Sequence, residues 1–266
     1  MSHHGRWESR ITIPTGDWTA SLTESGGGGA QTITLTAANT YYWSSAGNDT
    51  VDLPARLAAL LDAASVAAGN SNTYTVTVSA GELGTGKLSL SVSAGTFTLT
   101  SIDDDLEELM GLGGELTPTA ASWTGASHVE GLWLPDCPVE TPYGLASSGL
   151  VSSEAIITLA PDGTYFASHG SKMVTNEYVY EAVSVSKTVA ASESTTAESF
   201  ETWWLDTVRG EEPWASAGRQ VRFYKDVDDD ATFLTFNVTS VARPGISRRE
   251  SNYDGYWRVR LEVVEN

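Results

Sequence analysis

Residues 74 to 100 read YTVTVSAGELGTGKLSLSVSAGTFTLT, and this stretch decides the fold class of the chain. Apolar and polar residues alternate in three runs, at residues 74–78, 87–92 and 96–100. Such a period of two, rich in Thr, Val, Tyr and Phe, is typical of antiparallel strands with one buried and one wet face. Segment 94–95, Ala-Gly, is short enough for a tight hairpin. The stretch therefore predicts a meander of three strands, and residues 31–36 (QTITLT) predict another strand.

A helix is predicted before the meander, over residues 52–64. Asp52 can cap its first turn, and Pro54 suits an early helical position. Its apolar residues fall on one face, and they are Leu53, Leu57, Leu60, Leu61 and Ala64. Gly69 and Asn70 are predicted to end it.

A shorter helix is predicted after the meander. It begins at Asp103, Asp104 and Asp105, because carboxylates are favourable at a helix N-terminus. Gly111 ends it. Its inward residues are Leu106, Leu109 and Met110.

The second half of the chain repeats this order loosely. Pro161-Asp162-Gly163 predicts a turn between two strands, and residues 177–189 alternate as one long strand. Thr195 and Glu198 have the spacing of a capping box, which predicts a helix over residues 196–209. The apolar face of this helix is formed by Phe200, Trp203, Trp204 and Val208, and strands follow at residues 220–224, 233–241 and 255–264.

These patterns predict a mainly β protein with a minor α content. We expect two antiparallel sandwich-like or barrel-like halves, each with one packed helix. The boundary is placed in a stretch rich in Pro, Gly and Ser, which gives domains at residues 1–125 and 126–266. The N-terminal segment with Trp7 and Trp18 is expected to form an arm, and the glycine run 26–29 a flexible loop tip or arm hinge.

Composition excludes several classes of function. The 266 residues hold 34 acids and 15 bases, and a net charge of -19 argues against binding nucleic acid through its phosphates. Cys137 is the one cysteine, so neither an internal disulfide nor a cysteine-based zinc cluster is possible. No window approaches 18 apolar residues and no secretory signal is apparent, so we expect a soluble chain made in a cytoplasm.

Two motifs suggest ligands and are better explained without them. Gly81, Gly86 and Lys87 fit part of a phosphate-binding loop, but Leu88 stands where Ser or Thr is required, and the segment joins two strands. We interpret it as a hairpin turn and predict no cofactor. The acidic segment 226–230 lacks the glycine and the glutamate of an EF-hand. Its weak candidate calcium ligands are Asp226, Asp228 and Asp230.

No pattern predicts catalytic residues. The four histidines, which include His128 and His169, lack metal-binding spacing, and there is no G-x-S-x-G motif. Cys137 lacks a local nucleophile signature. The nine tryptophans are more informative, since exposed Trp marks interfaces or sugar sites. Trp203 is predicted to be core and Trp204 core or interface, and the interface candidates are Trp7, Trp18 and Trp204.

Two parts of the chain resemble structural proteins of tailed bacteriophages. The first runs from the helix at residue 53 through the meander to EELMGLGG, and the second holds FETWWLDTV, QVRFYKDVDDDATF and YWRVRLEV. The resemblance covers about half of the chain and transfers no catalytic residue. It implies a non-enzymatic virion subunit, most plausibly a tail tube or tail-tip component.

A subunit of this class is expected to work by self-assembly into homo-oligomeric rings with other virion proteins. It would be made in the host cytoplasm and end in the virion, without specific nucleic-acid binding or a membrane span. An acidic lumen would repel DNA. Two alternatives remain open at this point. One is a capsid decoration or a receptor-binding or glycan-binding protein that uses exposed Trp and calcium, and the other is a hydrolase.

Overall fold

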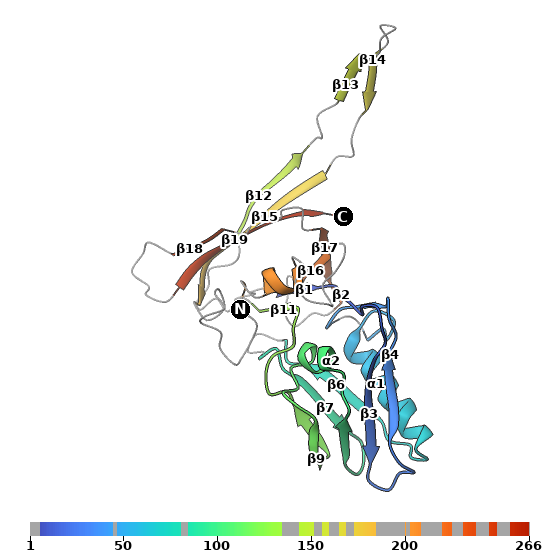
Figure 1. Ribbon diagram of the computed structural model, residues 1–266. Helices are drawn as coiled ribbons and strands as arrows, with labels where there is room; N and C mark the ends of the chain where they lie inside the picture. Colours follow the sequence, from blue (N-terminus) through green and yellow to red (C-terminus); the bar gives the residue numbers. More distant parts are fainter. Residues whose placement is uncertain are drawn as a thin grey trace.

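The chain folds as a mainly β protein. The computed structural model describes residues 6–44, 47–80, 85–134, 144–151, 156–159, 165–168, 173–184, 200, 203–208, 220–224, 231–237, 245–248 and 256–265. The predicted fold class is thus confirmed. The two halves of the chain nevertheless differ, because the first contains a two-sheet sandwich and the second contributes most of one large sheet (Figure 1).

The sandwich consists of two antiparallel sheets. A four-stranded sheet has the order β4-β3-β8-β9, with bounds β3 (Trp18–Glu24), β4 (Gln31–Leu35), β8 (Phe97–Thr100) and β9 (Leu116–Ala120). A three-stranded sheet has the order β10-β7-β6, with bounds β6 (Tyr74–Val78), β7 (Leu88–Val92) and β10 (Ser122–Thr124). Buried and exposed residues alternate along β3, which confirms that one face of that strand lies against the core.

The predicted meander is right in its strands and wrong in its pairing. β6 and β7 pair as expected, with Tyr74 opposite Val92. β8 crosses to the other sheet and pairs with β3, where Leu22 lies opposite Leu99. The Ala-Gly segment before β8 is therefore a crossover between sheets. Alternation identifies the buried face of a strand, but the partner of that strand is set by contacts distant in the sequence.

Two helices pack on the sandwich largely as predicted. α1 (Leu53–Ala67) packs against β3, β4 and β6 and closes one side between the two sheets. Asp52 is at its N-cap position, but the predicted side-chain cap is wrong, because that side chain makes no capping hydrogen bond and the Leu53 amide donates to the Tyr42 carbonyl at 2.9 Å. Gly69 follows the helix with φ of +83°. α2 (Asp104–Leu109) begins at Asp103, whose side chain accepts a hydrogen bond from the Asp105 amide at 3.2 Å. Each helix therefore ends at a glycine in the left-handed region, since Gly111 has φ of +62°.

The glycine run 26–29 lies in the loop between β3 and β4, which contacts the C-terminal end of α1, and it is not an arm hinge. The Gly28 amide donates to the Ala68 carbonyl at 2.8 Å, so the loop satisfies an acceptor at the C-terminus of α1. A Cβ at Gly28 would lie 3.2 Å from the same carbonyl oxygen. Glycine therefore allows a close backbone approach here.

The large sheet contains eight strands in the order β11-β1-β16-β17-β19-β15-β12, with β18 also paired to β19. Their bounds are β1 (Arg6–Ser9), β11 (Leu132–Trp133), β12 (Gly144–Val151), β15 (Met173–Ser184), β16 (Gln220–Tyr224), β17 (Phe233–Asn237), β18 (Gly245–Arg248) and β19 (Tyr256–Glu265). β2 (Ile11–Thr12) follows β1 in the sequence and pairs with β5 (Thr40–Tyr41) as a separate two-stranded sheet.

The predicted N-terminal arm is instead an inner strand of this sheet. β1 lies between β11 and β16, and all four of its residues are buried. The sandwich ends with β10 at Thr124, and the chain enters the large sheet at β11. Residues 6–9 thus belong to a sheet formed mostly by the second half of the chain.

The helix predicted over residues 196–209 is described at Phe200 and over a π-helical turn, η3 (Trp203–Val208). The predicted capping box lies outside the described residues. The predicted apolar face is confirmed as buried at Phe200, Trp203, Trp204 and Val208.

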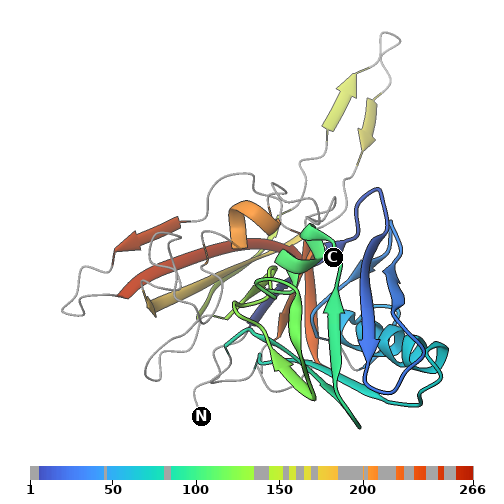
Figure 2. The same ribbon diagram turned by 60° about the horizontal axis from the view of Figure 1, so that its bottom comes forward.

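A long hairpin projects from the large sheet. β12 and β15 pair antiparallel and continue into β13 (Ile156–Leu159) and β14 (Tyr165–Ser168), which pair with each other. Figures 1 and 2 show β13 and β14 extending away from the other strands in both views. The strands on either side of the predicted turn at residues 161–163 thus pair as expected.

Candidate functional site

The three tryptophans predicted at an interface all lie inside the chain. Trp7, Trp18 and Trp204 are 0%, 3% and 2% exposed. Side chains so deeply buried have no surface to offer to a neighbour, so Trp7 and Trp18 are core residues and not interface residues, and Trp204 follows the core alternative of its prediction. Trp7 is enclosed because β1 is an inner strand, and Trp18 because it faces the sandwich core.

The predicted ligand sites divide between described and undescribed parts of the chain. Asp226, Asp228 and Asp230 lie outside the described residues. Within the described ranges, no group of three or more His, Cys, Asp or Glu residues has the geometry to hold a metal ion. Lys87 donates to the Ala126 carbonyl at 2.8 Å, and the strands on either side of residues 81–86 pair as a hairpin. The lysine thus ties the start of β7 to the segment after β10.

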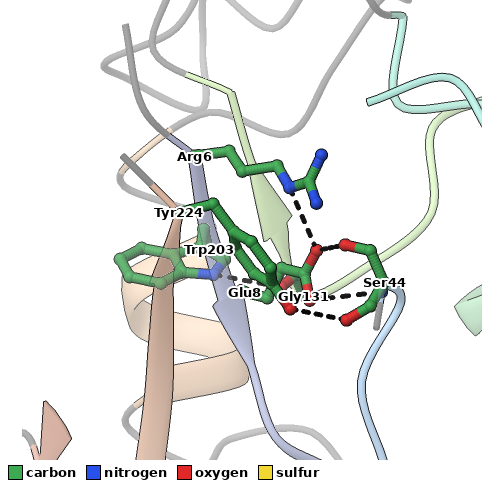
Figure 3. A network of polar contacts seen from close by, with 6 residues as sticks. All are labelled: Arg6, Glu8, Ser44, Gly131, Trp203 and Tyr224. Carbon is green, nitrogen blue, oxygen red and sulfur yellow. Dashed lines mark hydrogen bonds and ion pairs between the residues drawn. The ribbon is translucent and has the colours of Figure 1, made fainter. Parts of the chain in front are cut away.

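A polar network that the sequence did not reveal lies between the large sheet and the chain after β5 (Figure 3). Glu8 is 0% exposed, and its carboxylate accepts hydrogen bonds from the Ser44 hydroxyl and from the Ser44 amide, the latter at 3.2 Å. Arg6 Nε lies 3.4 Å from Glu8 Oε1. The Tyr224 hydroxyl donates to the Ser44 carbonyl at 2.5 Å. We call these four residues the Glu8 network.

Strand register explains why these groups meet. Arg6 lies opposite Tyr224, and Glu8 lies opposite Arg222. Since side chains alternate across a strand, Arg6 and Glu8 of β1 lie on the same face of the sheet as Tyr224 and Arg222 of β16. Trp7 belongs to the other face and lies opposite Phe223. The sequence signal is the alternation of charged and apolar residues in RWES, but alternation does not predict that both faces are buried.

Guanidinium and aromatic groups extend the same face. The Arg6 guanidinium lies 4.2 Å from the centre of the Tyr224 ring. The Arg222 guanidinium lies 3.7 Å from the Tyr42 ring and 4.0 Å from the Phe233 ring. Cations over ring faces are attracted by the ring quadrupole. These contacts tie the chain after β5 to β16 and β17.

Burial keeps the tyrosines of this face in the neutral form. Burial is the largest cause that raises the pKa of Tyr224, and the Glu8 charge raises it further, against smaller effects of Arg222 and Arg6. Burial likewise raises the pKa of Tyr42, partly offset by Arg222 and Arg10. The Tyr224 hydroxyl therefore keeps the proton that it donates to Ser44.

An aromatic cluster covers the opposite face of β1. The Trp7 ring lies 4.5 Å from the Phe223 ring and 6.4 Å from the Trp203 ring, measured between centroids. Trp133 lies 4.6 Å from Phe200. The Trp203 indole N–H donates to the Gly131 carbonyl at 3.3 Å. Polar contacts on one face and aromatic packing on the other thus hold β1 firmly in the sheet.

A second buried carboxylate lies at the end of the sandwich. Glu24 is buried and accepts hydrogen bonds from Asn70 Nδ2 and Asn72 Nδ2, both at 2.9 Å, and from the Tyr74 hydroxyl at 2.8 Å. Burial alone raises the pKa of Glu24, but hydrogen bonds from Asn70, Asn72, Tyr74 and Ser65 outweigh it and lower the pKa. The carboxylate fastens the turn after α1 to β3 and β6.

Acid should weaken this attachment. Because the pKa of Glu24 is lowered in the folded state, its contribution to stability is present above the ordinary glutamate pKa of about 4.3 and is lost as pH falls through the folded value. We expect Glu24→Gln to lower the free energy of unfolding at pH 7 by about 1–3 kcal/mol. The difference from the unmodified protein should shrink below pH 4.

Denaturant unfolding at several pH values tests this expectation. Glu115→Gln is the matched control, since Glu115 is exposed and accepts a hydrogen bond from the Ser101 amide at 2.6 Å. An effect of Glu24→Gln that is the same at pH 7 and at pH 3 would contradict the assignment.

Both carboxylates hold the fold together and are screened from solvent. Glu8 and Ser44 could suggest an activated hydroxyl, but both are buried between protein elements. His128 is also buried, with Nε2 3.7 Å from Glu130 Oε1. The described polar clusters therefore position strands and loops, and the feature that reaches outward is the hairpin β12–β15.

None of the helices in the described part of the chain has the length and apolar character that crossing a bilayer demands.

Comparisons with known proteins give no assignment. A scan of protein-family models and searches of curated proteins and of solved structures found no match to this chain.

Proposed function

We propose that this protein is a structural subunit of a bacteriophage virion, most plausibly a tail tube or tail-tip ring component. Its task is to assemble with copies of itself and with other virion proteins, and it catalyses no reaction. It is built in the host cytoplasm and ends in the particle. This extends the resemblance of its helix at residue 53, its strands of residues 74–100 and its C-terminal segments to tail proteins.

The observation that carries the proposal is the projecting hairpin. β13 and β14 form a two-stranded sheet of their own, set apart from the other described strands (Figure 2). A lone pair of strands is marginally stable in water, because it lacks a further strand or helix to bury its surface. Contact with a neighbouring subunit supplies that surface. A hairpin of this kind therefore suits a protein that works in an assembly.

The arrangement of buried groups supports the same function. The Glu8 network and Glu24 place their carboxylates inside the fold, where they join sheets and loops. The glycan-binding alternative relied on exposed tryptophans, but Trp7, Trp18, Trp43 and Trp133 are buried, and Trp123 is partly buried against the sandwich core. No observation on the described residues favours that alternative. A chain with a net charge of -19 would also repel DNA from a lumen that its copies enclose.

Electron microscopy of the purified full-length chain tests the proposal. We expect closed rings or stacked tubes, because identical heterologous contacts close into rings. Sedimentation velocity should show association that grows with protein concentration. A compact monomer at high concentration, also in the presence of other virion proteins, would refute the proposal.

Removing the hairpin tip should separate folding from assembly. Val151 lies opposite Met173 in the ladder, so residues 152–172 can be replaced by Asn-Gly, which suits a two-residue hairpin turn. We expect the shortened chain to unfold within a few degrees of the unmodified protein and to associate at least tenfold more weakly. Thermal unfolding by circular dichroism and sedimentation velocity measure the two effects. Unchanged association would show that the tip takes no part in assembly.

A further inference from the structure

In the described part of the chain, one edge of β12 is unpaired and can accept a further strand. β12 pairs with β15 along one side, and no other described strand lies along its second side. An unpaired edge presents a row of backbone N–H and C=O groups, which is a template for another strand.

The other edge strands in the described ranges are short, blocked or covered: β13 and β14 have four residues each, and the part of β15 beyond β12, residues 180–184, contains a bulge. In the sandwich, α1 packs against the edge strands β4 and β6. β9 contains Pro118, which interrupts donation along its edge, and β10 has three residues. In the large sheet, β11 has two residues, and β18 is a four-residue strand that ends in Arg248. Short, charged and proline-containing edges are the usual protection against strand addition.

β12 lacks most of these protections. It has eight residues, GLASSGLV, with neither charge nor proline. A bulge between Leu145 and Ser147 interrupts its ladder with β15. From Ser147 to Val151 the register is continuous, with each residue opposite one residue of β15. The regular open edge is therefore residues 147–151, which is the typical length of a strand.

Charge favours a second copy of this chain as the partner. Two copies with a net charge of -19 each repel one another, and this repulsion is least where few charges lie. Residues 144–176 contain only Glu154, Asp162 and Lys172 as charged residues, for a net charge of -1. The open edge thus belongs to a nearly neutral stretch of an acidic protein.

We propose that residues 147–151 of β12 pair with a strand of a second copy and extend the eight-stranded sheet across the subunit boundary. The inference rests on the proposed function of self-assembly, and it names the surface at which the copies join. Main-chain hydrogen bonds supply the affinity in this mode of recognition, so it does not require the exposed apolar anchors expected from Trp7, Trp18 and Trp204.

Two proline variants of the full-length chain, Ser148→Pro and Gly149→Pro, test this pairing. Proline lacks the N–H group. Neighbouring residues of a strand direct their N–H groups to opposite sides, so one variant loses a bond toward β15 and the other loses a donor on the open edge. Each variant is the matched control of the other. Thermal unfolding identifies which variant keeps the ladder intact, and sedimentation velocity measures association.

We expect the variant that unfolds within a few degrees of the unmodified protein to associate at least tenfold more weakly. Amide exchange of residues 147–151 in the unmodified protein should slow as the protein concentration rises. The pairing is refuted if both variants associate normally, or if association falls only in the less stable one, while the unmodified chain still forms rings. A monomeric unmodified chain would instead refute the proposed function itself.

Discussion

Glu8→Ala is expected to lower the free energy of unfolding by about 3–5 kcal/mol, the usual cost of removing one partner of a buried ion pair. The Ser44 hydroxyl and amide would lose their acceptor, and the buried Arg6 guanidinium would lose the carboxylate 3.4 Å from its Nε. Such a loss is a large part of the 5–15 kcal/mol that stabilises a typical domain. Denaturant unfolding at pH 7 provides the measurement.

A double-mutant cycle separates the ion pair from the loss of packing. Arg6→Met, Glu8→Met and the combined variant should show a coupling of about 0.5–3 kcal/mol, so that the double variant costs less than the sum of the single variants. Met keeps much of the apolar volume of both side chains. Strictly additive losses would mean that Arg6 and Glu8 do not interact energetically, whatever their distance.

Gly111→Ala should be the most damaging glycine substitution in the sandwich. Gly111 has φ of +62°, and a Cβ there would lie 2.3 Å from the His128 carbonyl oxygen and 2.8 Å from that of Ser127. The backbone conformation alone costs about 1–2 kcal/mol for a residue with a Cβ. The overlap with backbone atoms adds about 1–3 kcal/mol, because the 127–128 segment has to move.

Gly69→Ala is the matched control for this substitution. Gly69 also follows a helix and has φ of +83°, but a Cβ there meets nothing within 4 Å. It should therefore show the backbone cost without the overlap, and unfold at a clearly higher denaturant concentration than Gly111→Ala. Equal losses in the two variants would mean that the 127–128 segment yields without cost.

In the proposed assembly, the strand that is held most firmly, β1, and the strand that would meet a neighbour, β12, lie toward opposite ends of the large sheet. β1 is fixed on one face by the Glu8 network and on the other by the aromatic cluster around Trp7 and Trp203. β12 is the edge strand at the other end of the same sheet, and β13 and β14 form a separate pair beyond it. A sheet held firmly at β1 limits the directions in which β12 can point. We expect this preorganisation to lower the entropic cost of the proposed assembly.

Local sequence was sufficient for the helices and for most strands. The pattern around Asp52 and Pro54 predicted α1, and Gly69 and Gly111 predicted the two helix ends. These features depend on residues within a few positions of one another. Their physics is local: Asp103 caps α2, a left-handed glycine follows each helix, and each helix buries one face. The start of α1 is different, because Asp52 does not cap it through its side chain.

Tertiary structure alone decided the partners. Alternation in β8 gave its buried face but not its pairing with β3, and the composition of RWES did not reveal an inner strand of the large sheet. Trp7 and Trp18 were predicted to be exposed anchors because they lie in segments without clear periodicity. They are buried by strands and loops far away in the chain. Whether the second face of a strand is buried, and which strand pairs with it, depends on contacts between residues far apart in the sequence. The free energies of these contacts cannot be inferred from a local pattern of residues.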